Sequence, residues 1–316
     1  MNFRFIDLFA GIGGMRLAFE KAGGECVFSS EWDKDSQRTY AANFGETPAG
    51  DITKIEATEI PKFDVLLAGF PCQPFSSIGK RAGFKHKTQG TLFYDVLRII
   101  EAKRPSAFLL ENVKGLVSHD KGKTLEVILR SLEEQGYAVH YKILDSADYG
   151  LPQVRKRIYI VGFNKRKVKN CQEFSWPKPK RNKVGIGSFV EKGITDRSIS
   201  KHLQNSYIFK LDDGRPEIID KNSDFPVKTL VASYHKIQRL TGTFVSDGPT
   251  GLRLLTANEC KAIMGFPKSF KIPVSRTQLY RQFGNSVAVP VVSLVAKQMI
   301  LTLEISMKLK KVVKHG

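Results

Sequence analysis

The sequence predicts an α/β fold in which a buried sheet is flanked by helices. Short apolar runs alternate with longer amphipathic segments, which is typical of strands connected by helices. The run at residues 65–68 stops at Gly69 and Pro71, so it is expected to be a central strand. Cys72 follows directly, between two prolines that fix the backbone. Because ligands of such sheets gather at the carboxyl ends of strands, Cys72 is a candidate functional thiol.

Length and composition describe a globular chain with a large positive charge. With 316 residues, one large and one smaller domain are expected. Lys and Arg number 50 against 31 Asp and Glu, and the net charge of +19 has the sign that attracts nucleic acid or an anionic membrane. We expect no membrane contact, because no apolar stretch approaches the ~18 residues that span a bilayer. No secretory signal is present, so a cytoplasmic location is expected.

The four cysteines do not form a metal-binding or disulfide pattern. They stand far apart and include no CxxC pair. We therefore expect no metal site and, in a reducing compartment, no disulfide. A reactive thiolate could persist under those conditions. The alternative for Cys72 is a buried core residue, because free cysteine commonly packs as a small hydrophobic side chain.

A glycine-rich turn near the N-terminus predicts close approach of the backbone to a small molecule. The turn joins an expected strand over residues 3–9 to an expected helix over residues 15–21, and it contains Gly11, Gly13 and Gly14. The last glycine of the dinucleotide pattern GxGxxG is missing. A ligand without a pyrophosphate is therefore expected rather than NAD.

Two acidic residues and one aromatic residue follow at positions that suit an adenosine-like ligand. The expected strand over residues 26–30 leads to Glu31, where nucleotide-type folds place an acid on ribose hydroxyls. Trp32 could stack on an adenine. A helix is expected over residues 35–43. Asp51, at a short strand end after it, could accept from an adenine amino group or be a solvated turn residue.

The middle of the chain supplies a second set of polar groups. A buried strand over residues 107–113 carries Glu111, and a carboxylate in such a place is costly unless it is paired or used. Further on, strand alternation puts Gln153, Arg155 and Arg157 on one face of an extended segment. Three aligned donors can bind a base or a carboxylate, and a solvated basic face is the alternative.

A change in composition divides the chain. Residues 165–183 hold eight Lys or Arg, one Glu and two prolines, and from about residue 188 to 247 the periodicity is poor. A capping box at Thr256 then begins a helix, and a last helix is expected over residues 290–307. We predict a large α/β domain over residues 1–185 completed by residues 284–316, a small irregular β domain over residues 186–255, and a hinge segment over residues 256–283.

Five motifs in this order resemble those of the DNA cytosine-C5 methyltransferases, particularly the short bacterial restriction-modification enzymes. The resemblance extends from Phe3 to about Ala296, apart from the variable region near residues 188–255. It implies a Rossmann-like methyltransferase sheet flanked by helices, with a small target-recognition domain. The motifs are Phe9-Ala10-Gly11-Ile12-Gly13, Pro71-Cys72-Gln73, Glu111-Asn112-Val113, Gln153-Val154-Arg155-Lys156-Arg157 and Gly284-Asn285.

The resemblance also implies a cofactor and catalytic roles. Cys72 is implied to add to C6 of a cytosine, while Glu111 holds N3 and the exocyclic amine. Arg157 is implied to hold O2 of the base, with support from Arg155. The cofactor is S-adenosyl-L-methionine, and its implied contacts are Phe9, Gly11, Gly13, Glu31, Trp32, Asp51, Ile52, Pro71, Asn285 and Val287.

The implied substrate is duplex DNA with the target cytosine flipped out of the helix. The basic loop over residues 76–88 is expected to close over the DNA, and the recognition domain is expected to read the sequence. Which recognition-domain residues read bases is left open. The expected DNA contacts are Gln73, Ser76, Lys80, Arg81, Thr229, Tyr234, Gln238 and Arg239.

The predicted function is cytosine-C5 methylation at a specific short DNA sequence, which protects host DNA from a cognate restriction endonuclease. The endonuclease is expected to be a functional rather than a physical partner. The protein is expected to be a monomer in the cytoplasm, associated with the nucleoid. Two alternatives stay open: a transfer-RNA cytosine-C5 methyltransferase, and a DNA-binding relative without catalysis.

Overall fold

The computed structural model describes residues 2–71 and 92–315, with side chains described for residues 2–71 and 92–307. The candidate thiol and the basic loop over residues 76–88 lie outside this part of the chain. The predictions that cannot be examined for this reason concern Cys72, Gln73, Ser76, Lys80 and Arg81.

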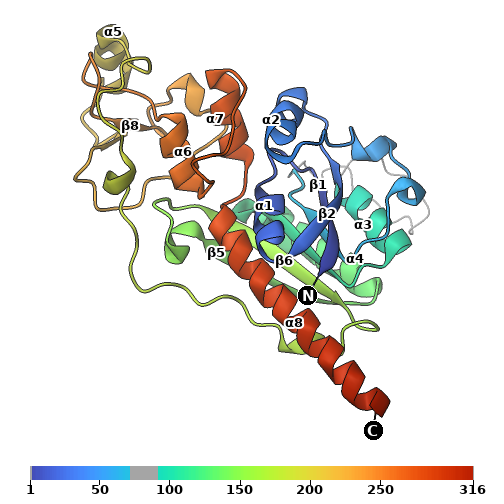
Figure 1. Cartoon of the computed structure of the whole chain (residues 1–316). Coiled ribbons are helices and arrows are strands. Elements are labelled where there is room, and N and C mark those ends of the chain that lie inside the picture. Colours follow the sequence, from blue (N-terminus) through green and yellow to red (C-terminus); the bar gives the residue numbers. More distant parts are fainter. Residues whose placement is uncertain (1, 72–91, 316) are drawn as a thin grey trace.

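A six-stranded sheet with the strand order β2-β1-β3-β4-β6-β5 forms the centre of the large domain (Figure 1). The pairs β2-β1, β1-β3 and β3-β4 are parallel, whereas β6 runs antiparallel to both β4 and β5. The predicted α/β sheet is confirmed. Its strands are β1 (Phe3–Leu8), β2 (Gly24–Ser30), β3 (Val65–Ala68), β4 (Ala107–Val113), β5 (Tyr137–Asp145) and β6 (Lys156–Asn164).

The register of the sheet aligns the carboxyl ends of its central strands. Leu8 of β1 lies opposite Ala68 of β3, and Ala68 lies opposite Leu110 of β4. The residues that follow these three positions therefore meet at one edge of the sheet. Because β6 is antiparallel, it begins at the same edge, where Arg157 lies opposite Val113.

Helices cover both faces of the sheet and give it two apolar cores (Figure 1). Leu67 faces the core that contains α1 and α8, while Leu66 faces the core that contains α3 and α4. Burial on both faces explains why the strands are continuous apolar runs. The helices of this domain are α1 (Gly14–Lys21), α2 (Lys34–Phe44), α3 (Leu92–Lys103), α4 (Lys123–Glu134) and α8 (Val289–His315).

The remainder of the chain has little regular structure, as predicted. Strands β7 (Glu217–Ile219) and β8 (Thr243–Val245) form a two-stranded parallel sheet, and α5 (Lys201–Leu203) is short. Helix α6 (Ala257–Met264) begins at the predicted capping box, and α7 (Arg276–Asn285) follows it. The domain boundaries remain predictions, and the one expected at residue 284 falls inside α7.

Two local predictions differ from the structure. Asp51 does not end a strand but caps the 3-10 turn Ile52–Lys54, because its carboxylate accepts from the backbone of Thr53 at 3.0 Å.

The helical stretch Arg276–Met307 contains a window of mean hydropathy 1.7 that is long enough to cross a bilayer. This window is 61% buried and α8 packs against α1, so this stretch forms part of the protein core.

Candidate active site

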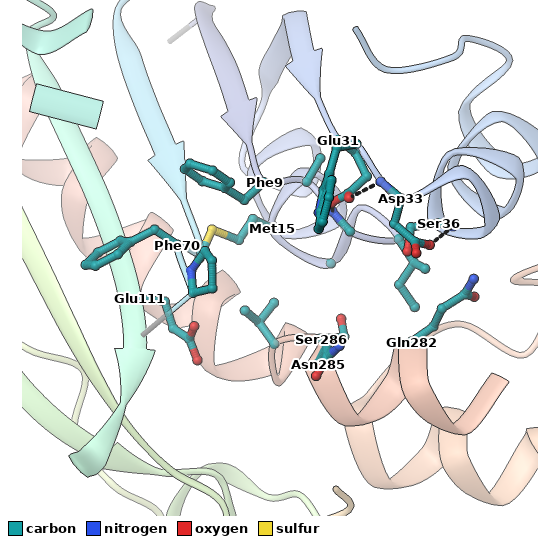
Figure 2. A pocket seen from close by; sticks show the side chains of 18 of the residues that line it. Phe9, Met15, Glu31, Asp33, Ser36, Phe70, Glu111, Gln282, Asn285 and Ser286 are labelled. Carbon is teal, nitrogen blue, oxygen red and sulfur yellow. Dashed lines mark hydrogen bonds between the residues drawn. The ribbon is translucent and has the colours of Figure 1, made fainter. Parts of the chain in front are cut away.

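A cavity of about 630 Å³ lies at the edge of the sheet where β1, β3 and β4 end. Segments that follow these strands form part of its wall, and the end of α7 with the turn into α8 forms another part (Figure 2). Glu111, Arg155 and Arg157 line it. Nine of the ten expected cofactor contacts also line it: Phe9, Gly11, Glu31, Trp32, Asp51, Ile52, Pro71, Asn285 and Val287.

Glu31 is fixed after β2 by two backbone N–H groups (Figure 2). The Gly11 N–H donates to Oε2 and the Asp33 N–H donates to Oε1, both at 2.8 Å. Asp33 in turn caps α2 by accepting from the Ser36 N–H. Burial raises the pKa of Glu31, and the backbone donors oppose that shift. Carboxylate oxygens have further lone pairs, so Glu31 can still accept from the hydroxyl groups of a ligand.

Aromatic and apolar side chains line the cavity beside Glu31. Trp32 is 74% exposed, so the face of its indole is open to a flat ligand. Met15 and Phe70 add apolar wall (Figure 2). Phe9 has a φ of 55°, which is uncommon outside glycine, and such strained residues cluster at functional sites. The sequence motif indicated Phe9 but neither Met15 nor Phe70.

Gly13 is the one expected cofactor contact that does not line the cavity. It caps α1 with a φ of 83°, and a Cβ there would lie 2.2 Å from Cε2 of Phe44. The absence of a side chain at Gly13 therefore allows α1 and α2 to pack, and its contact with the cofactor stays a prediction. Gly11 has a φ of 55°, and a Cβ there would meet no heavy atom within 4 Å.

Glu111 and Arg157 form an ion pair at the other end of the cavity. The distance between Arg157 Nε and Glu111 Oε1 is 3.3 Å, and the two side chains are 16% and 12% exposed. Burial raises the pKa of Glu111, while the charges of Arg157 and Arg155 oppose that shift. The carboxyl group is therefore protonated more readily than an ordinary glutamate. A protonated carboxyl beside a guanidinium can donate one hydrogen bond and accept another.

Asn112 connects the ends of β3 and β4. Its buried side-chain Nδ2 donates to the carbonyl oxygen of Phe70 at 2.9 Å, and its Oδ1 accepts from the Val113 N–H at 2.8 Å. This fixes the backbone that leads from β3 to Pro71. Asn112 belonged to a recognised motif, but the sequence did not indicate this bridging contact.

Arg155 and Arg157 both line the cavity, whereas Gln153 does not, although one shared face was predicted for all three. The Arg155 side chain donates to the carbonyl oxygens of Leu230, Gly284 and Ser286 at 2.7–3.1 Å. The Gln153 side chain accepts from the Leu230 N–H at 2.8 Å and is buried. Both residues therefore connect the sheet to the recognition domain. Burial, with Arg157 nearby, lowers the pKa of Arg155 to about 10, so it stays charged at neutral pH.

All four expected DNA contacts in the recognition domain have hydrogen-bond partners inside the protein, and Gln238 Oε1 accepts from the Ser233 and Thr241 hydroxyls. Tyr234 is buried and donates to the carbonyl of Thr243. Arg239 is buried in an ion pair with Asp213, and Thr229 donates to the Val154 carbonyl at 2.7 Å. Tyr234 and Arg239 are therefore buried in the domain, which does not favour the predicted base contacts. Gln238 is exposed and remains a predicted contact.

Helix α7 brings two amide side chains to the cavity that no motif indicated. Gln282 is buried, and its Oε1 accepts from the Thr39 hydroxyl at 2.9 Å. Its Nε2 and the Oε1 of Gln278 are buried without a hydrogen-bond partner among the residues described. Both residues line the cavity (Figure 2 labels Gln282). Their spacing of four residues, just before Gly284, is the sequence signal that could have indicated them.

Comparison with known proteins identifies the family. A family model for C-5 cytosine-specific DNA methylase matches residues 3–301. The chain belongs to this family. It is 60% identical over 303 residues to type II methyltransferase M.MspI of Moraxella sp. This alignment covers 96% of this chain and 72% of the relative. It is 60% identical over 296 residues to type II methyltransferase M.BsuFI of Bacillus subtilis, which covers 93% of this chain and 72% of the relative.

Solved structures show the same fold for this DNA cytosine-C5 methyltransferase. The S. pombe Dnmt2 methyltransferase has a TM-score of 0.74 at 23% identity and covers 96% of this chain and 98% of its own. A Spodoptera frugiperda DNMT2 mutant has a TM-score of 0.73 at 23% identity, and the match covers 95% of this chain and 99% of that chain. The family model and the relatives confirm the predicted family and enzyme class, and the solved structures confirm the predicted fold.

Proposed function

We propose that this methyltransferase transfers a methyl group from S-adenosylmethionine to C5 of a cytosine flipped out of a specific duplex sequence. The observation that carries the proposal is a single cavity with two chemically different ends. Glu31, Trp32 and Asp51 at one end suit a nucleoside, while Glu111 and Arg157 at the other suit a pyrimidine. A methyl donor and its acceptor base can therefore share one cavity.

The cavity fits S-adenosylmethionine in size and in polar groups. Its volume of about 630 Å³ is typical of small-molecule sites. Glu31 would hold the ribose hydroxyls, Asp51 the adenine amino group, and Trp32 would stack on the adenine ring. Gly11 leaves space where a side chain would project, and Gln282 Nε2 is a buried donor without a partner among the described residues. When bound, the cofactor supplies an electrophilic methyl group.

Cytosine C5 is a poor nucleophile, so the protein must first activate the ring. Cys72 follows Pro71 in the chain, and Pro71 lines the cavity. The Cys72 thiolate would form a bond to C6, which moves ring electrons toward C5 and N3. Glu111 would donate a proton to N3, and Arg157 would hold O2. Once C5 carries the methyl group, loss of the C5 proton to a base and return of the N3 proton to Glu111 would restore the ring and expel the thiolate.

These groups cannot reach a cytosine that is stacked in a duplex. We therefore include base flipping in the proposal, at a cost of roughly a few kcal/mol. The net charge of +19 would supply phosphate contacts that offset this cost. Gln238 stays a candidate base contact, together with the candidates outside the described residues.

The biological setting is proposed from the relatives, which are named type II methyltransferases. Methylation would protect host DNA from a cognate restriction endonuclease that acts separately. A cytoplasmic, nucleoid-associated monomer would suit this role, because the described part of the chain holds both ends of the cavity without a second copy.

The test is covalent trapping with 5-fluorocytosine, whose C5 carries no proton that can be removed. The protein is incubated with S-adenosylmethionine and with duplex DNA or RNA that contains the analogue, and adducts are resolved under denaturing conditions. We expect an adduct on DNA that is absent in Cys72→Ala. The two proteins should have the same melting temperature, which shows that the loss is chemical.

Each alternative has its own outcome in this experiment. An adduct on RNA but not on DNA would favour the transfer-RNA methyltransferase. Binding of DNA without any adduct or labelled methyl transfer would favour a relative that has lost catalysis. An adduct that persists in Cys72→Ala would contradict the assignment of the nucleophile.

A matched pair of glycine substitutions should separate cofactor binding from packing. Gly13→Ala is expected to lower stability by more than the ~1–2 kcal/mol that the left-handed backbone alone costs, because its Cβ would overlap the Phe44 ring. Gly11→Ala is expected to incur the backbone cost alone and to weaken cofactor binding, because it borders the cavity. Thermal unfolding and calorimetric titration of S-adenosylhomocysteine measure the two effects. Equal cofactor affinity in Gly11→Ala and wild type would contradict the assignment of Gly11.

A further inference from the structure

The excess positive charge is concentrated outside the recognition domain. Residues 165–183, here called the basic strap, hold eight Lys or Arg against Glu173 alone, a net charge of +7 out of +19. Residues 186–255, where sequence reading is proposed, hold ten basic and eight acidic residues, a net charge of only +2. The charge that would attract DNA is therefore not located chiefly where the DNA would be read.

The basic strap is anchored to the large domain. Val168, Cys171, Phe174 and Pro177 are buried, while the basic residues between them are exposed. Backbone groups add fixed contacts: the Lys169 N–H donates to Ser306 Oγ at 3.0 Å, and the Pro177 carbonyl accepts from the Tyr149 hydroxyl at 3.1 Å. The Lys180 N–H donates to the Asp148 carbonyl at 2.7 Å. The basic residues thus lie exposed on an ordered support, and the Lys167 Nζ also donates to the Arg104 carbonyl.

Within the described part of the chain, the basic side chains of the strap form no ion pair with a carboxylate. Among the salt bridges of residues 2–71 and 92–307, none involves the strap. Like charges this close repel one another, and a phosphate backbone would relieve the repulsion and release counterions. The exposed basic residues are Lys165, Arg166, Lys167, Lys169, Lys178, Lys180, Arg181 and Lys183.

The first part of the strap lies away from the catalytic cavity. It runs along α8, with residue 169 beside Ser306 and Ser175 beside Gln298, whereas Lys180 lies beside Asp148 and the chain then continues toward the recognition domain (Figure 1). The cavity meets the chain at Val287, before the start of α8. At a rise of about 1.5 Å per residue, the contacts at Gln298 and Ser306 lie about 16 Å and about 28 Å along the chain direction of α8 from Val287. No strap residue lines the cavity.

We propose that the basic strap is a second DNA-contacting surface, which holds a duplex segment other than the one that presents cytosine to the cavity. The inference rests on the proposed function, because DNA is the polyanion that this enzyme must meet. Contacts of this kind involve phosphates and not bases, so they are independent of sequence and weaken as salt increases. A second segment held there would keep the enzyme on long DNA between target sites.

The experiment compares two variants with equal change in charge. The strap variant replaces Lys165, Arg166, Lys169 and Lys178 by glutamine. The control variant replaces Lys21, Lys62, Lys123 and Arg130 by glutamine as well. These are exposed residues of the large domain outside the strap. Each protein is first trapped on a short duplex with 5-fluorocytosine at its target, so that the cavity is filled. A labelled second duplex without the target is then titrated at several salt concentrations.

We expect the trapped wild type and control variant to bind the second duplex, and the strap variant to bind it about tenfold or more weakly. The slope of log affinity against log salt should fall by about 0.9 for each phosphate contact that is lost. Adduct formation should be unchanged in both variants. It reports the proposed function separately from the strap, so an absent adduct would contradict that function and not the strap.

Three outcomes would overturn the inference. The trapped wild type could fail to bind a second duplex, or the strap variant could bind it as tightly as the control. In the third outcome, the wild type binds phosphatidylglycerol vesicles but does not bind the second duplex, and the strap variant does not bind the vesicles. This result would assign the strap to a membrane surface.

Discussion

Replacement of Glu111 by glutamine is expected to slow methyl transfer by ~10²–10⁴-fold, the usual contribution of a positioned acid. The amide keeps the shape of the side chain but cannot transfer a proton to N3. The same substitution is expected to raise the melting temperature. Burial disfavours the charged form of Glu111, and this effect outweighs the attraction of Arg157 and Arg155. Glutamine removes the buried charge, and each kcal/mol gained would raise the melting temperature by about 2 °C.

The sign of the pH dependence follows from the raised pKa. Between the ordinary value of 4.5 and the raised value, the folded protein binds more protons at Glu111 than the unfolded chain does. The contribution of Glu111 to stability is therefore complete below pH 4.5 and is lost as the pH rises through the raised pKa. Wild type and Glu111→Gln should be similarly stable in acid, and the variant should be the more stable at neutral pH.

Single-turnover methylation and thermal unfolding from acid to neutral pH measure both effects. Glu101→Gln is the matched control, because Glu101 is exposed on α3 and should change neither quantity. A fully active Glu111→Gln variant would remove proton donation from the proposed mechanism. A variant that is less stable than wild type at neutral pH would mean that the ion pair with Arg157 outweighs the cost of burial.

The sheet could be predicted because its evidence is local. Strand β3 is apolar on both faces and is followed directly by Gly69. Four consecutive apolar residues and a glycine that ends the strand were therefore enough to predict its position. Glu31 and Glu111 were predicted for a related reason: Glu31 directly follows a strand, and Glu111 lies where the apolar run of β4 stops. Parallel topology then brings such strand ends to one edge, which needs no knowledge of side-chain packing.

The rest could not be predicted, because side-chain partners come from distant parts of the chain. Arg239 suits base reading by residue type, but Asp213 and two carbonyl groups hold it inside the domain. Gly13 belongs to the glycine motif, yet the residue that requires its missing side chain is Phe44, on another helix. Gln282 acquires its role from Thr39, 243 residues earlier. Spacing along the chain carries no signal for contacts of this kind.

Replacement of Arg155 by lysine is expected to lower the free energy of unfolding by about 2–4 kcal/mol. Arg155 donates to three carbonyl groups from Leu230, Gly284 and Ser286, which belong to two separate parts of the chain. Lysine has a single ammonium group and cannot reach all three, and each buried acceptor left unpaired costs about 1–3 kcal/mol. Denaturant unfolding measures the loss. Arg130→Lys is the control, because that side chain is exposed.

A second variant separates the electrostatic effect of Arg155 from its structural effect. Arg155→Met removes the charge that lowers the pKa of Glu111, so that pKa should rise further. The pH at which activity falls as Glu111 ionises should then move upward in Arg155→Met and stay in place in Arg155→Lys, where the charge remains. An unchanged pH profile in both variants would limit Arg155 to domain packing. A profile that shifts equally in both would mean that Glu111 responds to altered packing and not to the charge.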